Sequence, residues 1–319
     1  MTKVVAMRDA LLTQIHAKMA TDETIFFVTA DFGSPILDKI RQDFPKRFVN
    51  VGIAEQNLIN VCAGLAIEGF TVFAYAIAPF ITMRCFEQLR VNLALLSEVR
   101  EMNVNLIGVG AGYSYVVSGP THQCYEDLSL MRSLPNFQIF SPSDQDTSAG
   151  LISLCTDELG PKYIRLDAQM LPKLRSDIDK STIENGFEKL LEGPDGVIIA
   201  TGYMTHTALN VARELMPKFN LGVIDLINIS GFNIDAFNEI ISNVDLIFSL
   251  EEGFESRGGM DTMLQNHLKK FHPKARFHGL GVRPGYSFEL GTREELHEQV
   301  GIGKNAALER IKMGLISKG

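Results

Sequence analysis

The segment that decides the fold begins FVNVGIAEQN at residues 48–57 and ends SGPTHQ at residues 118–123. After the first string, apolar residues recur at helical spacing until a glycine ends the pattern: Ala54, Leu58, Val61, Leu65 and Gly69. The next expected elements alternate: a strand at 71–76, a helix at 80–96 and a strand at 103–108. Such alternation indicates a mostly parallel sheet with helices on both of its faces.

The same alternation extends to both sides of this segment. Residues 24–30 read TIFFVTA, an apolar, β-branched and aromatic run that predicts a buried strand. That strand ends at Asp31, and open α/β sheets place their ligands at the carboxyl ends of strands. The other elements expected in this half are helices at 4–20, 36–43, 126–133 and 144–156 and strands at 47–51, 137–141 and 163–166.

A polar, charged stretch without a strong period, residues 168–193, interrupts the pattern. Alternation then restarts, with strands expected at 197–201, 222–225 and 246–250, helices at 205–216, 235–242 and 259–271, and two further helices from Thr292 and Asn305. We therefore predict two three-layer α/β domains with mostly parallel sheets, at residues 1–170 and 194–319, joined by a linker at 171–193.

Composition excludes several classes of function. The formal net charge is -8 and no Lys/Arg-rich block occurs, so a nucleic-acid partner is not expected. No apolar run approaches the ~20 residues of a membrane span. The histidines and the four scattered cysteines show no metal-binding spacing. We expect a soluble, cytoplasmic protein with reduced thiols and no metal site of its own.

Taken singly, the candidate site residues have ordinary explanations. Glu55, in the first turn of a helix, complements the helix dipole. Asp31 fits a turn or a helix cap. Phe80 fits a packed core, and a loop histidine such as His122 is commonly a solvated surface residue.

Their surroundings favour a function. The strings GIAEQN (52–57), FITMRCFEQLR (80–90) and GPTHQ (119–123) resemble the pyrimidine-binding domain of thiamine-diphosphate enzymes of the transketolase family. EEGF, GGM and GTREEL, which begin at residues 251, 258 and 291, resemble the C-terminal domain of that family, and we expect them to serve packing and subunit contacts. The resemblance covers nearly the whole chain, and GPTHQ is its most specific short string.

The resemblance implies a role for each candidate residue. Glu55 contacts N1′ of the aminopyrimidine and stabilises the tautomer that removes the thiazolium C2 proton, for which its carboxyl should be desolvated. Phe80 stacks on the aminopyrimidine with Arg84 beside it, in a string one residue longer than in relatives. His122 lies near the substrate carbonyl as a hydrogen-bond donor or proton shuttle. Asp31 lies near the cofactor.

One element of the family is missing from the sequence. Relatives hold Mg²⁺ and the diphosphate with Gly-Asp-Gly followed by an Asn ligand, and the chain contains no Gly-Asp-Gly. The resemblance therefore implies a split enzyme, in which an N-terminal transketolase subunit holds the metal and the diphosphate of thiamine diphosphate. The expected assembly is a heterotetramer with a homodimer of this chain at its core.

Three positions bear on the substrate. Relatives that act on sugar phosphates carry polar or basic residues where this chain has Gly110, Ser118 and Ala168. Loss of a bidentate arginine–phosphate pair is not easily compensated. The predicted activity is transfer of a two-carbon ketol unit from a ketose to an aldose, with substrates outside the usual sugar-phosphate pair unless the partner supplies the anchor.

Three alternatives stay open at this point. The chain could be the β subunit of a 2-oxoacid dehydrogenase, which shares the fold and an equivalent glutamate. It could be part of a deoxyxylulose-phosphate-synthase-like condensing enzyme, or a non-catalytic scaffold that retains the fold. GPTHQ together with FEQLR favours transketolase, and the joint presence of Glu55, Phe80 and His122 argues against a scaffold.

Overall fold

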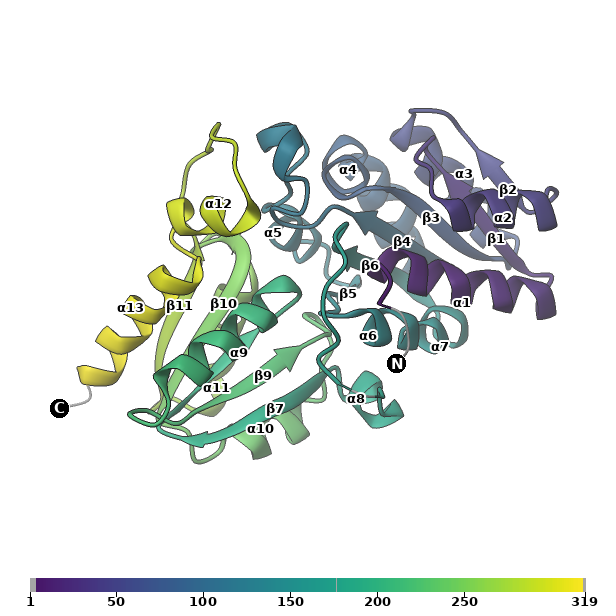
Figure 1. Ribbon diagram of the computed structural model, residues 1–319. Coiled ribbons are helices and arrows are strands. Elements are labelled where there is room, and N and C mark those ends of the chain that lie inside the picture. Colours follow the sequence, from purple (N-terminus) through teal and green to yellow (C-terminus); the bar gives the residue numbers. More distant parts are fainter. Residues whose placement is uncertain (1–3, 176, 318–319) are drawn as a thin grey trace.

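The computed structural model describes residues 4–175 and 177–317. Its first half is built on a six-stranded sheet with the order β2-β1-β3-β4-β6-β5 (Figure 1). These strands are β1 (Ile25–Thr29), β2 (Phe48–Asn50), β3 (Thr71–Ile77), β4 (Asn103–Val109), β5 (Gln138–Phe140) and β6 (Gly160–Leu166). Every pairing is parallel, so the carboxyl ends of the strands meet along one edge of the sheet.

Helices cover both faces of this sheet. One core joins the strands to α1 (Met7–Thr21), α2 (Pro35–Asp43) and α7 (Ile152–Asp157). A short helix, α6 (Gln145–Gly150), comes directly before α7. The other core joins them to α3 (Glu55–Ile67) and α5 (Asp127–Met131). Local signals set the helix ends: at α2, Ser34 Oγ accepts the N–H of Leu37 (3.3 Å), and Pro35 occupies the first turn, where no N–H is needed.

The second half carries a five-stranded sheet with the order β11-β10-β8-β9-β7. Its strands are β7 (Phe187–Pro194), β8 (Gly196–Ala200), β9 (Leu221–Leu226), β10 (Leu246–Phe254) and β11 (Arg276–Val282). Its helices are α9 (Tyr203–Leu215), α10 (Ile234–Ile241), α11 (Met260–Phe271), α12 (Arg293–Val300) and α13 (Lys304–Ile316), with α8 (Lys180–Asn185) leading in. Helices lie on both faces, which confirms the predicted fold class (Figure 1).

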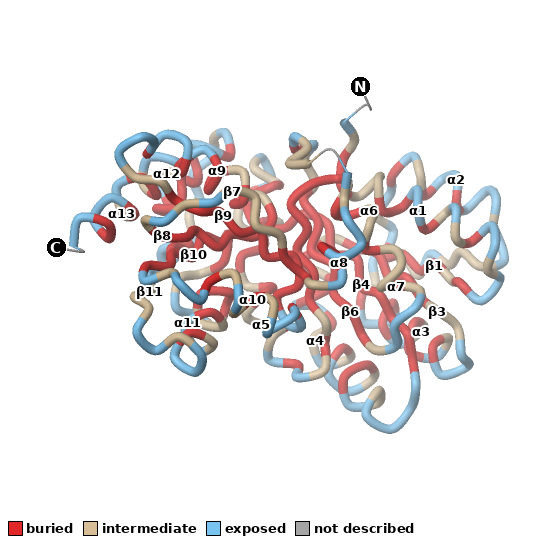
Figure 2. The backbone as a smooth tube through the Cα atoms, turned by 90° about the horizontal axis from the view of Figure 1, so that it is seen from below, coloured by how far each residue is buried: buried red, intermediate tan, exposed pale blue. Residues whose placement is uncertain are grey.

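The two halves share one apolar core. The core that holds α3 and α5 continues into β8, β9, α10 and α11 of the second half. Figure 2 shows this as buried backbone running without interruption from the first sheet to the second. No helix within the described residues has the length and apolar character that crossing a membrane requires.

The stretch expected to be a linker, residues 171–193, is partly built into the second half. It contains α8 and most of β7, and β7 pairs antiparallel with β9. The strand escaped notice because it lies at the sheet edge, where its residues are mostly half-buried or exposed and charges break the apolar alternation. The second sheet therefore begins at Phe187, while the domain limits at 170 and 194 stay a prediction.

A buried ion pair fastens α5 to the first sheet. Asp127 Oδ2 accepts hydrogen bonds from Arg165 Nε (2.7 Å) and Tyr163 Oη (2.8 Å). The side chains of Arg165 and Asp127 are 2% and 0% exposed. Removing one member of such a pair leaves an uncompensated charge in the interior.

We therefore expect Asp127→Ala to lower the free energy of unfolding by about 3–5 kcal/mol, because Arg165 would stay buried without its counter-charge. Urea denaturation of the purified chain measures this. The matched control is Asp38→Ala, which removes an exposed pair with Arg41 and should cost about 1 kcal/mol or less. Equal losses in the two variants would contradict the assignment.

Candidate functional site

The carboxyl edge of the first sheet gathers the predicted site residues. Asp31 lies two residues after β1, Glu55 opens α3 after β2, and Phe80 follows β3. His122 lies in the loop after β4. In the sheet, β2 and β3 lie on opposite sides of β1, so the strand order reverses there. Open α/β sheets bind ligands at the carboxyl ends of the strands where such a reversal occurs.

Four of the five predicted site residues, Glu55, Arg84, Phe80 and His122, form a continuous series of contacts. Glu55 is 2% exposed, and its Oε2 accepts a hydrogen bond from Arg84 Nη1 (2.7 Å). The Arg84 guanidinium carbon lies 4.2 Å from the centroid of the Phe80 ring, a cation–π contact. The Phe80 ring in turn meets the imidazole of His122 edge-on, with 5.3 Å between centroids. The expected desolvation of Glu55 is present.

The helix expected at 80–96 has an unusual winding. Residues Phe80–Arg84 and Leu89–Leu95 are π-helical (η1 and η2), and the short α4 (Phe86–Gln88) lies between them. A π-turn accommodates one extra residue without breaking the helix, and such turns are frequent at functional sites. From this winding Arg84 reaches both Phe80 and Glu55.

Asp31 does not join this series. It is exposed, its φ is +53°, and its side chain accepts a hydrogen bond from Asn50 Nδ2 (2.8 Å). Asn50 Oδ1 in turn accepts the N–H groups of Asp31 (3.1 Å) and Gly52 (2.9 Å). Sequence reasoning missed Asn50, although an Asn shortly before a Gly is a turn signal. The pair shapes the turn that leads into Glu55.

The three positions that bear on the substrate present no cation. A side chain at Gly110 would overlap the ring of Tyr115, which lies 2.0 Å from the place of its Cβ. Ser118 is exposed and Ala168 is half-buried. Among the residues that the structure describes, no group of three or more His, Cys, Asp or Glu could hold a metal ion.

Comparison with known proteins agrees with this geometry. The family model of the transketolase pyrimidine-binding domain matches residues 3–173, and that of the transketolase C-terminal domain matches residues 186–306. The chain belongs to the transketolase family. The resemblance seen in the sequence is thereby confirmed.

Several transketolase-family proteins resemble the chain over its whole length. It is 28% identical, over 97% of its length and 98% of the relative, to an apulose-4-phosphate transketolase subunit of Phocaeicola vulgatus. It is 27% identical to a 6-deoxy-6-sulfo-D-fructose transketolase subunit of Clostridium sp., over 93% of this chain and 90% of the relative. A solved split-gene transketolase, described as an inactive beta4 tetramer, superposes with a TM-score of 0.84 at 27% identity, covering 98% and 99% of the two chains.

Full-length members of the transketolase family are about twice as long. The transketolase of Campylobacter jejuni matches the fold with a TM-score of 0.78 at 20% identity, over 98% of this chain but 47% of that one. The chain is thus a transketolase-family transferase subunit of the split kind, with the pyrimidine-binding and C-terminal domains on one polypeptide.

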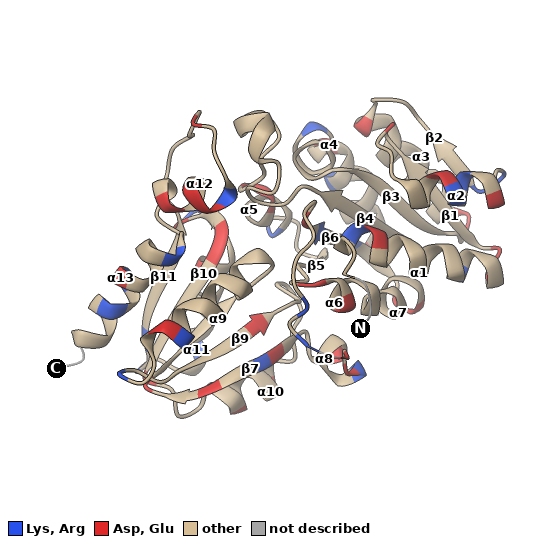
Figure 3. Ribbon diagram, viewed as in Figure 1, with Lys and Arg blue, Asp and Glu red and all other residues tan. Residues whose placement is uncertain are grey.

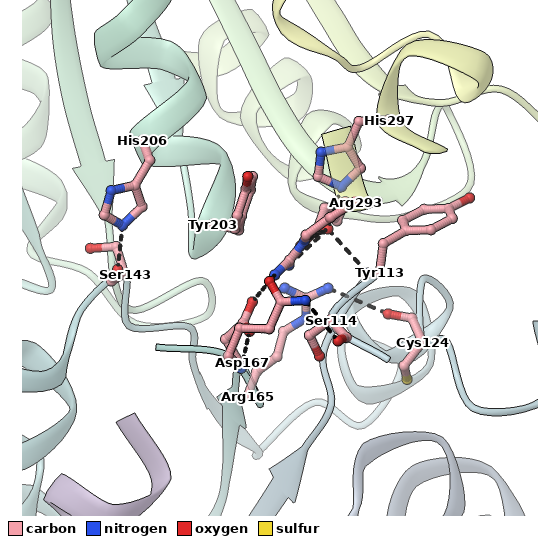
Figure 4. A network of polar contacts seen from close by, with 12 residues as sticks. Tyr113, Ser114, Cys124, Ser143, Arg165, Asp167, Tyr203, His206, Arg293 and His297 are labelled. Atoms are coloured by element: carbon pink, nitrogen blue, oxygen red, sulfur yellow. Dashed lines mark hydrogen bonds and ion pairs between the residues drawn. The ribbon is translucent and has the colours of Figure 1, made fainter. Parts of the chain in front are cut away.

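The family's C-terminal strings, which we expected to serve packing and subunit contacts, build a buried charge network. Figure 3 shows the acidic end of β10 beside the start of α12, which begins with Arg293. Arg293 Nη2 donates to both oxygens of Glu252 (2.9 and 2.7 Å), and Arg293 Nη1 lies 2.6 Å from Asp167 Oδ2 (Figure 4). Burial opposes the charge of Glu252, but Arg293 and His297 outweigh it and hold the pKa of Glu252 well below its usual range.

The preceding residue, Glu251, behaves in the opposite way. It accepts the N–H groups of Met260 (3.1 Å) and Asp261 (2.7 Å) at the start of α11. Burial, with the charge of Asp261 adding to it, raises the pKa of Glu251 to about 7. Because the folded state holds this proton more tightly than the unfolded chain, the stability it contributes is full below about pH 4.5 and is lost as the pH rises through about 7.

We expect the free energy of unfolding of the native chain, relative to that of Glu251→Gln, to fall by about 2–3 kcal/mol between pH 4.5 and pH 8. Glutamine keeps the shape of the protonated acid but cannot ionise, so titration of other groups cancels in the difference. Urea denaturation over this pH range measures it. A pH-independent difference between the two proteins would contradict the assignment.

Proposed function

We propose that this chain binds the aminopyrimidine half of thiamine diphosphate and, with a separate polypeptide that holds the diphosphate and Mg²⁺, catalyses transfer of a two-carbon ketol unit from a ketose to an aldose. The observation that carries the proposal is the series Glu55, Arg84, Phe80 and His122 at the carboxyl edge of the first sheet. It joins a buried acid, an aromatic face and an imidazole in one place.

The residues fit the cofactor on chemical grounds. Oε2 of Glu55 accepts from Arg84, and no hydrogen bond within the described residues engages Oε1. A buried carboxylate with one acceptor left suits a ring N–H donor. The half-buried Phe80 ring offers a face on which a flat heteroaromatic ring can stack.

Each side chain has a defined part in the proposed reaction. Thiamine diphosphate, when bound, supplies a carbon nucleophile that attacks the ketose carbonyl. Arg84 donates a hydrogen bond to one oxygen of the Glu55 carboxylate, and Glu55 would accept the hydrogen bond from the pyrimidine nitrogen. His122 donates a proton to the substrate oxygen and takes it back. Asp31 is proposed to border the cofactor through the turn that it shares with Asn50.

The proposed assembly follows from what the chain lacks. It matches about half of full-length transketolases, and no metal-binding cluster occurs within the described residues. Relatives of similar length are named as transketolase subunits, and a split-gene relative forms a beta4 tetramer. We therefore propose a heterotetramer with a homodimer of this chain at its core. The four buried free thiols suit a cytoplasmic location.

The proposed substrates lie outside the usual sugar-phosphate pair. Gly110, Ser118 and Ala168 offer no cationic side chain that could pair with a phosphate, and the ring of Tyr115 fills the space beside Gly110. Two relatives are named for apulose 4-phosphate and 6-deoxy-6-sulfo-D-fructose, so members of this group accept unusual sugars. The comparisons do not favour a 2-oxoacid dehydrogenase subunit or a scaffold.

In the assembled enzyme, Glu55→Gln should lower kcat by about 100-fold or more, the range seen when a proton-transfer partner is lost. The amide cannot carry the charge that holds the pyrimidine N–H. Ketol transfer is measured with a coupled assay, and gel filtration checks that the complex still forms. The control is Glu87→Gln, an exposed residue of α4 that should leave kcat unchanged. Full activity of Glu55→Gln would refute the role.

A second measurement compares ribose 5-phosphate with ribose as acceptor. We expect kcat/KM for the phosphate ester to exceed that for ribose by less than about tenfold, below the ~10–100-fold that a charge-assisted hydrogen bond to phosphate contributes. A larger preference that persists when cationic residues of the other polypeptide are replaced would contradict the proposed substrate class.

A further inference from the structure

We propose that the second domain positions His122, and that Glu252 is the positioning residue: its carboxylate fixes the base of the loop that carries the imidazole. The inference rests on the proposed function, since it assigns His122 a catalytic part. It goes beyond that function by giving the C-terminal domain a task in the reaction other than packing and assembly.

The loop that carries His122 is closed at its base by a short bridge. Gly112 N donates to Cys124 O (2.8 Å), and Cys124 N donates back to Gly112 O (2.9 Å). His122 lies two residues before Cys124, so the position of this bridge sets the position of the imidazole. The next N–H of the loop, that of Tyr113, donates to Glu252 Oε1 (3.1 Å).

The loop base lies directly against this carboxylate. A Cβ added at Gly112 would be 2.2 Å from Oε2 and 2.3 Å from Cδ of Glu252, and the φ of Gly112 is +56°. Both the close approach and the left-handed backbone therefore require glycine at this position. Any movement of the Glu252 carboxylate would move the bridge.

The Glu252 carboxylate is itself held rigidly. Arg293 and His297 of α12 bind it, His297 through Nε2 at 2.7 Å from Oε1, and both side chains are 2% exposed. The Arg293 guanidinium rests on the Tyr203 ring, 3.8 Å from its centroid. Arg293 is therefore fixed by packing as well as by charge.

The same arginine reaches the loop by a second route. Arg293 Nη1 donates to Gln169 Oε1 (3.3 Å), and Gln169 Nε2 donates to the carbonyl oxygen of Ser114 (3.1 Å). Figure 4 shows Arg293 and His297 of the second domain pointing toward Asp167, Tyr113 and Ser114 of the first. Two successive loop residues are thus held: Tyr113 by Glu252 of β10, and Ser114 through Gln169 by Arg293 of α12.

The far end of the segment that contains His122 is held by the loop that follows β10. Arg132, which follows α5, donates through Nη1 to the carbonyl oxygens of Gly258 and Gly259. The residues after these glycines are held by Glu251, the neighbour of Glu252 on β10. The segment 112–132, with His122 inside it, is therefore attached at one end to Glu252 of β10 and at the other end to the loop that follows β10.

The arrangement separates substrate chemistry from cofactor binding. Within the described residues, no hydrogen bond or ion pair joins Glu252 to Glu55, Phe80 or Arg84, which lie on α3 and η1. A change at Glu252 should therefore disturb the step that uses His122 and leave the hold on the aminopyrimidine unchanged.

The test is Glu252→Gln in the assembled enzyme. We expect kcat to fall about 100-fold, the cost of a misplacement on the order of 1 Å, with the Kd of thiamine diphosphate unchanged. Glu255→Gln is the matched control: it removes a partly exposed pair with Arg310 at the end of the same strand and should not change kcat. A fall in cofactor affinity equal to the fall in kcat would overturn the proposal.

A double-mutant cycle tests the link to His122. If Glu252 acts through the imidazole, adding Glu252→Gln to His122→Ala should lower kcat by no more than about twofold beyond His122→Ala alone. Two losses that multiply would overturn the proposal.

Hydrogen exchange gives a readout that does not need activity. In the isolated chain, amides of residues 112–124 should exchange faster in Glu252→Gln, and also in Gly112→Ala, which approaches the contact from the loop side. Unchanged exchange in folded samples of both would overturn the proposal. If the native complex shows no ketol transfer but this exchange difference is present, the proposed function fails, while the positioning of the loop by Glu252 is supported.

Discussion

The ion pair between Arg293 and Glu252 lies within the second domain and places Arg293 against Asp167 of the first domain. Both side chains are buried, so each charge depends on the other and on Asp167 across the domain boundary. Removing one partner of such a pair costs about 3–5 kcal/mol, a large part of the roughly 5–15 kcal/mol by which a protein is stable. The contact of Arg293 with Asp167 therefore joins the two domains. The loop that follows β4 and carries His122 lies against the carboxyl end of β10.

We propose that the first domain carries half of an active site. Glu55 is buried with Arg84 on one oxygen, Phe80 offers an aromatic face, and His122 closes the series. These groups can bind and orient a heteroaromatic ring, but they offer nothing for a diphosphate or its metal ion. In the proposed assembly, the second polypeptide would hold the diphosphate and its metal ion, so the cofactor would bind fully only after the two polypeptides associate.

The sequence predicted the regular part of the structure well, because buried parallel strands and amphipathic helices have local patterns. The run TIFFVTA predicted β1, and GIAEQN predicted the start of α3. GPTHQ indicated the loop that carries His122. Edge strands β7 and β11 escaped notice because half-exposed residues break the apolar alternation. The sequence predicted a helix at Phe80 but not its π-helical winding. In that winding Arg84 contacts Glu55 of α3, which is distant in the sequence. The network around Glu252 joins residues far apart in the chain, and its strings EEGF and GTREEL give no local sign of their pairing.

The central claim is that the cofactor site is complete only when a second polypeptide joins this one. Isothermal titration calorimetry of thiamine diphosphate with Mg²⁺ tests it most directly, with this chain alone and with a diphosphate-binding partner encoded beside it. We predict no measurable heat of binding for the chain alone and stoichiometric binding, one cofactor for each copy of this chain, in the complex. Binding of equal affinity to the chain alone would contradict the account.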